Sequence, residues 1–155
     1  MKLSTKGRYA VMAMVDIGQQ AGGEPVSLAE IAARQEISQE YLEQLFMKLR
    51  RAGMVESARG PGGGYRLARN ASEIAVAEII AAVDEPVKVT RCEGDAVDGC
   101  VRGERCSTHD LWQSLGRQMM NFLSAITLED VVQKRNLALA AAIRQAKSRP
   151  LLRRA

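Results

Sequence analysis

Two serine-capped helices in close succession constrain the fold of this chain more than any other feature. Ser27 opens a capping box with Glu30, because a serine at the N-cap and a glutamate three residues later can satisfy each other's backbone N–H groups. Ser38 supplies a second N-cap. The sequence therefore predicts a short helix from Ser27 and a longer one from Ser38 to about Ala52, with Gly53 placed to end it.

A glycine-rich hairpin is predicted directly after these helices. Alternation of apolar and polar residues over 54–58 and over 65–68 predicts two strands, and the turn Arg59–Gly64 joins them. The turn lacks the Gly-Lys-Ser/Thr ending of a nucleotide-binding loop. The order helix, helix, hairpin is typical of a winged helix-turn-helix, whose second capped helix enters the major groove of DNA. A plain glycine hairpin remains the alternative for the turn alone.

Charge is unevenly distributed along the 155 residues, which carry a net charge of +4. Residues 44–69 hold six basic side chains and one acid, whereas 73–110 hold nine acids and four bases. A basic block in a folded region favours a polyanionic partner, although a solvated face gives the same pattern. The longest apolar run, Leu137–Ile143, is far too short to span a membrane. With no secretory signal recognisable, we expect a cytoplasmic protein.

The second capped helix and the hairpin supply the predicted contacts to double-stranded DNA. Gln and Glu near the start of such a helix can read base edges, and Lys and Arg can contact phosphates. Arg59 at the base of the wing is the predicted minor-groove residue. Taken alone, the helix residues could also form a solvated face. The predicted DNA contacts are Ser38, Glu40, Tyr41, Glu43, Gln44, Lys48, Arg50, Arg51, Ser57, Arg59, Gly60, Pro61, Gly62 and Gly63.

All three cysteines of the chain lie close together, and its single histidine follows them. Cys92, Cys100 and Cys106 lie in a polar, glycine-containing segment, and His109 comes three residues after the last of them. Buried structural cysteines would be expected on apolar stripes instead. Thiolates and an imidazole bind either zinc or an iron–sulfur cluster. The wide spacing favours a cluster over zinc, because zinc sites usually use tight Cys-x₂₋₄-Cys pairs.

A long amphipathic helix is predicted after the cysteines. Its near-heptad apolar stripe suits pairing with a second copy, although packing within one chain would give the same pattern. We find no set of acid, base and nucleophile that would indicate an enzyme. The predicted dimerisation residues are Leu111, Trp112, Leu115, Met119, Phe122, Leu123 and Ile126.

Four segments of the chain resemble the IscR-type iron–sulfur cluster regulators. They are Leu3–Val11, Tyr41–Phe46, Arg59–Tyr65 and Cys106–Trp112, and the resemblance extends from Met1 to about Gln133. The chain departs from the usual pattern in a longer Cys92–Cys100 loop, in Glu40 and in its last residues.

The resemblance implies a homodimeric transcription regulator that binds pseudo-palindromic operators. It implies one [2Fe–2S] cluster per subunit, held by Cys92, Cys100, Cys106 and His109. The cluster form would repress genes for cluster assembly, and the cluster-free form would still bind other operators. The resemblance also implies that Glu43 separates the two operator classes. A [4Fe–4S] sensor of iron or nitric oxide, or a zinc-stabilised regulator, is the alternative.

Together these patterns predict a mainly α fold with a small β-hairpin and four regions. The regions are a winged helix-turn-helix DNA-binding domain (1–84), a cluster-binding loop (85–106), a dimerisation helix region (107–133) and a basic tail (134–155) that could be disordered.

Overall fold

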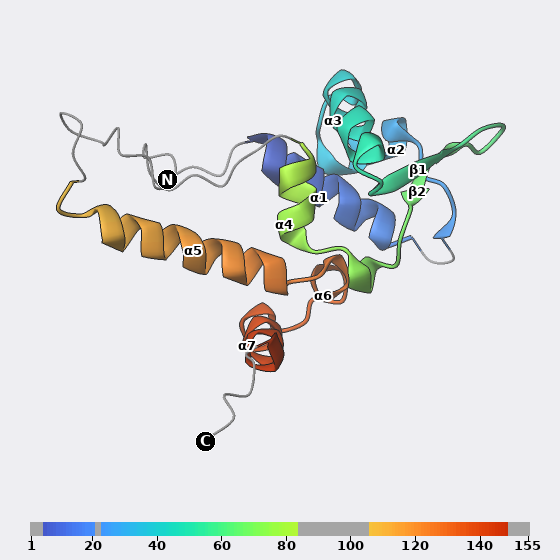
Figure 1. The fold of residues 1–155 in the computed structure, drawn as a ribbon. Coiled ribbons are helices and arrows are strands. Elements are labelled where there is room, and N and C mark those ends of the chain that lie inside the picture. Colours follow the sequence, from blue (N-terminus) through green and yellow to red (C-terminus); the bar gives the residue numbers. More distant parts are fainter. Residues whose placement is uncertain (1–4, 21–22, 84–105, 149–155) are drawn as a thin grey trace.

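The computed structural model describes residues 5–20, 23–83 and 106–148, and it confirms the mainly helical winged-helix fold (Figure 1). The winged-helix part contains α1 (Thr5–Gly18), α2 (Leu28–Gln35), α3 (Gln39–Arg51), β1 (Val55–Ala58), β2 (Gly64–Leu67), the short 3₁₀ turn η2 (Ala71–Glu73) and α4 (Val76–Ala82). The remainder contains α5 (His109–Ala125), α6 (Leu128–Val132) and α7 (Leu137–Ser148). No described helix is long and apolar enough to cross a membrane.

The two predicted caps begin α2 and α3. Ser27 Oγ accepts a hydrogen bond from the Glu30 N–H, and Glu30 Oε2 accepts one from the Ser27 N–H at 2.9 Å. Ser38 Oγ accepts from the Tyr41 N–H at 3.3 Å. Gly53 follows α3 with a φ of +68°, the left-handed conformation that ends helices and that glycine adopts without strain.

A buried carboxylate fixes α2 against α1. Asp16 is 2% exposed, and Arg34 donates to it from Nε at 3.0 Å and Nη2 at 2.6 Å. Gln35 Nε2 also donates to this carboxylate, at 2.7 Å. Burial raises the pKa of Asp16, but the bonds from Arg34 and Gln35 and the charge of Arg34 outweigh burial and lower that pKa. The helix-turn-helix is therefore held to α1 by a charged contact as well as by the core.

The main core lies between α1, α2, α3, α4 and the base of the hairpin. Phe46 and Met14 are fully buried in it, together with Ile31, Leu42, Leu49 and Ile79. These side chains come from the apolar faces of four amphipathic helices. Because the apolar faces are buried, the polar faces of the helices are exposed to solvent.

The hairpin pairs antiparallel, with Val55 opposite Leu67 and Ala58 opposite Gly64. Val26, in the segment before α2, forms an isolated antiparallel β-bridge with Tyr65 of β2. The two residues exchange backbone hydrogen bonds of 2.9 and 2.8 Å. The wing is therefore attached by main-chain bonds to the residue just before the Ser27 cap.

Helix α5 is joined to the winged-helix part at its C-terminal end. The Val76 N–H donates to Ile126 O at 2.9 Å, and the Leu128 N–H donates to Ile74 O at 2.8 Å. Val76, Ile80, Ala125, Ile126 and Ala141 form a second, smaller core there. Figure 1 shows α5 extending away from this junction, so that its first turn lies at the far end.

Helix α7 occupies part of the predicted basic tail, where the sequence patterns predict no element. Arg144 of α7 donates to both carboxylate oxygens of Asp130, at 2.6 and 3.1 Å, and to Ala125 O at 2.8 Å. Arg135 donates to the same carboxylate at 3.1 Å. Arg135 and Arg144 of this region therefore share an acidic partner in α6.

The turn between α2 and α3 contains a strained residue whose replacement should stabilise the fold. Glu36 has φ +53° and ψ +42°, which costs a non-glycine residue about 1 kcal/mol. We expect Glu36→Gly to raise the free energy of unfolding by about 0.5 kcal/mol, since glycine's larger unfolded-state entropy offsets part of the gain. Urea denaturation measures this, and Ala33→Gly within α2 should have the opposite sign. A loss of stability in Glu36→Gly would contradict the strain argument.

Candidate functional site

The solvent face of α3 carries the side chains predicted to read bases. Glu40, Glu43 and Gln44 are exposed. Gln39 Nε2 donates to Glu43 Oε1 at 3.2 Å, which orients that carboxylate along the helix surface. An α-helix presenting polar groups in this way can enter a major groove, where amide and carboxylate groups discriminate bases.

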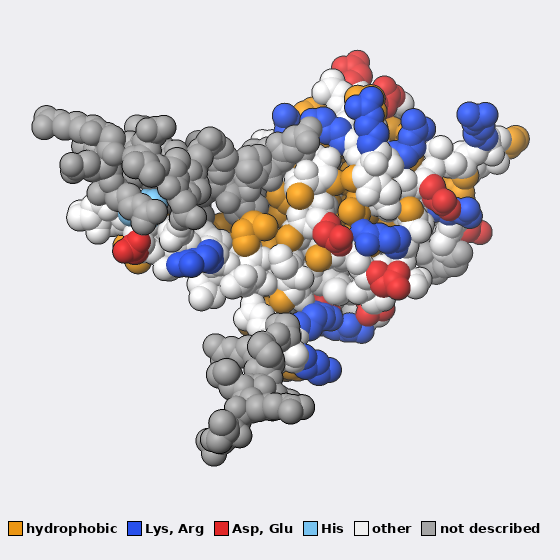
Figure 2. All heavy atoms as spheres, in the orientation of Figure 1, with side chains coloured by type: hydrophobic (Ala, Val, Ile, Leu, Met, Phe, Trp, Pro, Cys, Tyr) orange, Lys and Arg blue, Asp and Glu red, His pale blue; other side chains and the backbone are white. Residues whose placement is uncertain are grey.

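Basic side chains gather beside this face. Arg50 and Arg51 are exposed in the last turn of α3, and Lys48 is half-buried there. Figure 2 shows Lys and Arg side chains grouped over α3, with others on the wing. Such a surface attracts a phosphate backbone, which supplies affinity rather than sequence preference.

The wing presents its turn to solvent. Arg59, Gly60, Pro61 and Gly62 are exposed, and Gly63 is half-buried. Arg59 forms no hydrogen bond or ion pair with another described residue. In contrast, Arg66 of β2 donates to Glu56 at 2.6 Å, so the charge of Arg66 is already paired. Ser57, also a predicted contact, is exposed on β1.

Two predicted DNA contacts also have structural roles. The Tyr41 ring packs edge-on against Tyr9, with 5.9 Å between the ring centroids, so Tyr41 is only partly available to a ligand. The Ser38 hydroxyl caps α3, although the residue itself is exposed.

The described part of the cysteine region is the segment that begins α5. Cys92 and Cys100 lie outside the described residues, so the four predicted ligands are not seen together, and no metal-binding group of three appears among the described side chains. Cys106 is half-exposed, and His109 is 7% exposed. His109 Nε2 is buried and has no hydrogen-bond partner among the described residues. A buried imidazole nitrogen without a partner, three residues after a thiol, is suited to ligating a metal.

Hydrogen bonds from Thr108 affect Cys106. The Thr108 side chain and then its backbone N–H lower the pKa of the Cys106 thiol, which favours the thiolate that metals bind. Cys106 Sγ lies 3.5 Å from Thr108 Oγ1. Thr108 is a residue that sequence reasoning missed. The available signal was a hydroxyl residue two positions after a candidate ligand.

Helix α5 exposes part of its apolar stripe. Leu111 is 61% exposed, and Trp112 and Phe122 are also exposed, whereas Leu115, Met119 and Leu123 are half-buried. The prediction for Ile126 needs correction, because Ile126 is 2% exposed and packs in the chain's own second core. The backbone bond between Val76 and Ile126 turns that residue inward.

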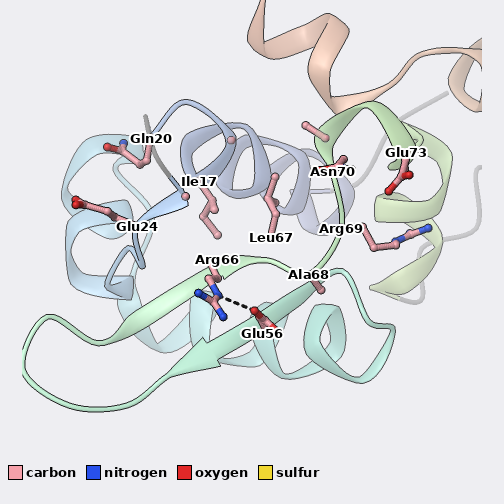
Figure 3. Close-up of a pocket in the computed structure, with 13 residues that line it drawn as sticks. Ile17, Gln20, Glu24, Glu56, Arg66, Leu67, Ala68, Arg69, Asn70 and Glu73 are labelled. Atoms are coloured by element: carbon pink, nitrogen blue, oxygen red, sulfur yellow. Dashed lines mark hydrogen bonds and ion pairs between the residues drawn. The ribbon is translucent and has the colours of Figure 1, made fainter.

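A hollow of about 600 Å³ lies between the end of α1, the rear of the wing and the segment leading to η2 (Figure 3). Arg66 and Arg69 line it, but the first is paired with Glu56 at 2.6 Å and the second with Glu78 at 3.5 Å. We therefore assign no ligand to this hollow.

Comparison with known families gives a match over residues 3–134 to Rrf2, described as an iron-dependent transcriptional regulator. The chain belongs to the Rrf2 family. The match and the regulator relatives make this chain a DNA-binding transcription regulator and not an enzyme, as the sequence predicts.

Named relatives place this Rrf2 chain among regulators of the IscR type. The HTH-type transcriptional regulator IscR of Photorhabdus laumondii is 53% identical over 137 residues, which cover 88% of this chain and 82% of the relative. The structure of T. potens IscR has a TM-score of 0.69 and 39% identity, covering 86% of this chain and 88% of that one. CymR, the global cysteine regulator of B. subtilis, has a TM-score of 0.73 and 33% identity, covering 88% and 99%.

Proposed function

We propose that this chain is a homodimeric regulator that senses iron–sulfur status and binds pseudo-palindromic operators. The observation that carries the proposal is the pair formed by Cys106 and His109 at the start of α5, with the buried His109 Nε2 left unpartnered among the described residues. The similarity to IscR relatives supports it.

The proposed ligands are Cys92, Cys100, Cys106 and His109, holding one [2Fe–2S] cluster per subunit. Such a cluster would supply a redox-sensitive and labile group. The chain's own residues would hold it at the far end of α5, while the other end of α5 bonds to α4 next to the winged-helix core. In the proposed activity, the cluster form represses cluster-assembly genes and the cluster-free form binds other operators.

The predicted apolar stripe of α5, without Ile126, is the proposed dimer interface. A twofold dimer would place its two α3 helices about one DNA turn apart, which matches a pseudo-palindromic operator. Apolar side chains exposed along one helix, such as Leu111 and Phe122, are expected to be covered in the assembled protein.

Anaerobic purification followed by absorption spectroscopy, with iron and sulfide assays on the same sample, tests the cluster proposal. Two iron and two sulfide per chain support it, and His109→Ala should then lose the visible bands while Ser107→Ala keeps them. Four of each would indicate a [4Fe–4S] sensor. A colourless chain with stoichiometric zinc, unchanged by reconstitution with iron and sulfide, would indicate the structural-metal alternative.

Arg59 should be a strong contributor to operator affinity. We expect Arg59→Ala to weaken binding by about 1–3 kcal/mol, because an exposed guanidinium on the wing, with no ion-pair partner among the described residues, can enter a minor groove. Gel shifts on an operator selected from random DNA, repeated over a salt series, measure this. Arg66→Ala is the matched control, since Arg66 lies on the same hairpin but is paired with Glu56. Equal losses of operator affinity in both variants would show that Arg59 contributes only its positive charge and makes no specific contact.

Glu43 should restrict operator choice rather than add affinity. A carboxylate on the reading face of α3 repels phosphate and rejects bases that offer it no donor, so Glu43→Ala should broaden the set of bound sequences. Selection from random DNA followed by sequencing compares the two site sets. Glu24→Ala removes one exposed acid outside α3 and should leave the set unchanged. Identical site rankings for wild type and Glu43→Ala would make Glu43 an ordinary solvated residue.

A further inference from the structure

The hydroxyl of Thr108 is not used to cap the helix that it precedes. Thr108 is the N-cap residue of α5, yet its side chain makes no capping bond, whereas the side chains of Ser27, Ser38 and Thr127 cap their helices. Instead, Thr108 Oγ1 lies 3.2 Å from Trp112 Nε1 and 3.5 Å from Cys106 Sγ. A residue type that usually caps helices is therefore directed to a sulfur and an indole.

The donors and acceptors of these three groups can be assigned. An indole N–H only donates, so Trp112 donates and Thr108 Oγ1 accepts. The single hydroxyl hydrogen of Thr108 then remains for another acceptor. A thiolate can only accept, and a metal ligand must be a thiolate, so the hydroxyl donates to Cys106 Sγ in the ligating state.

We propose that Thr108 and Trp112 are positioning residues for Cys106, forming a hydrogen-bonded relay from the indole through the hydroxyl to the ligand sulfur. This inference rests on the proposed cluster-binding function. The indole fixes the hydroxyl oxygen, and the hydroxyl hydrogen points to the sulfur. Hydrogen bonds to ligand sulfurs stabilise the more negative, reduced form of an iron–sulfur centre and so raise its reduction potential.

The placement of these residues at the start of α5 accounts for the relay. Thr108 and Trp112 are four residues apart and therefore lie on the same side of the helix start, one turn apart. Trp112 is 41% exposed, so its ring can face a second subunit while its N–H is bonded to Thr108. Replacing Trp112 with Phe keeps apolar bulk for that face and removes only the donor.

The first experiment uses the full chain without any cluster. Trp112 is the single tryptophan of the chain, so ultraviolet resonance Raman spectra report its indole N–H bond alone. We expect the band for the hydrogen-bonded N–H to shift in Thr108→Val and to be retained in Thr108→Ser, which keeps the hydroxyl. An unchanged band in Thr108→Val would overturn the relay.

The second experiment measures the reduction potential of the anaerobically loaded chain. We expect Thr108→Val to give the more negative potential, Trp112→Phe a smaller change in the same direction, and Thr108→Ser the wild-type value. Ser107→Ala, which removes a neighbouring exposed hydroxyl, should have no effect. Loaded variants with potentials identical to wild type would overturn only the relay. A wild-type chain that takes up no iron and sulfide would overturn the proposed function and the relay with it.

Discussion

Replacing Arg144 with alanine should lower the free energy of unfolding by about 3 kcal/mol. The carboxylate of Asp130 is fully buried, and Arg144 bonds both of its oxygens. Removing one partner of a buried charge costs about 3–5 kcal/mol, and we expect the lower end of that range because Arg135 still bonds Asp130 Oδ1 at 3.1 Å. Arg144 also donates to Ala125 O at the end of α5, so the substitution leaves that carbonyl without this donor. Urea denaturation measures the change as a lower midpoint.

Lys147→Ala provides the matched control for Arg144→Ala. Lys147 is a basic residue of the same helix, but it is exposed, and exposed substitutions usually change stability by less than about 0.5 kcal/mol. Similar effects for both variants would show that α7 contributes through its overall charge and not through Asp130.

The same contact predicts a specific pH dependence. Burial raises the pKa of Asp130, but hydrogen bonds from Arg144 and Thr127 outweigh burial and lower that pKa well below its ordinary value of 3.8. A carboxyl with a lowered pKa in the folded state stabilises the fold above pH 3.8, and this contribution is lost as the pH falls below that value. The stability difference between wild type and Arg144→Ala should therefore be constant well above pH 3.8 and shrink below it. A constant difference across the whole range would rule out Asp130 as the titrating partner.

Local patterns were sufficient to predict the winged-helix part. The capping residues Ser27 and Ser38 act on N–H groups three residues away, so their effect is visible in the sequence itself. Contacts between distant positions were not visible. Asp16 lies on α1 among apolar neighbours, and nothing local indicates that Arg34 and Gln35 will bond it.

Helix α7 was missed for the same physical reason. The sequence after Gln133 contains basic residues and no acid, which locally resembles a solvated tail. Its acidic partner, Asp130, precedes it on α6, where it also caps that helix through Thr127. The sequence pattern indicates only the local role of Asp130, which is its capping contact with Thr127, and not its ion pair with Arg144.

In the candidate site, too, local patterns predict some residues correctly and miss the effect of contacts between distant positions. Helical periodicity correctly predicted that Glu40, Glu43 and Gln44 face solvent on α3. Periodicity also placed Ile126 on the stripe of α5, but that helix ends at Ala125, and the backbone then turns to pair with α4. The apolar periodicity continues past the last residue of the helix, because a 3.6-residue repeat does not mark where a helix ends.

Gly64→Ala should be among the most damaging single-methyl changes in the wing. A Cβ at position 64 would lie 2.3 Å from Val26 O and 2.8 Å from Ser27 N, and both are backbone atoms that cannot rotate away. The change would force apart the bonds between Val26 and Tyr65, which attach the wing to the start of α2. Overpacking against backbone costs about 3 kcal/mol, and we expect a loss of that size in the free energy of unfolding.

Gly62→Ala separates this steric effect from glycine's conformational freedom. Gly62 has φ +78°, and a Cβ added there would meet no described heavy atom within 4 Å, so alanine should cost about 1 kcal/mol through backbone strain alone. The two variants should also differ in DNA binding at temperatures where both are folded. Gly64→Ala displaces the wing relative to α3 and should weaken operator binding, whereas Gly62→Ala strains only the tip. If Gly62→Ala destabilised the fold as much as Gly64→Ala, the close approach of Val26 would not be the reason for a glycine at position 64.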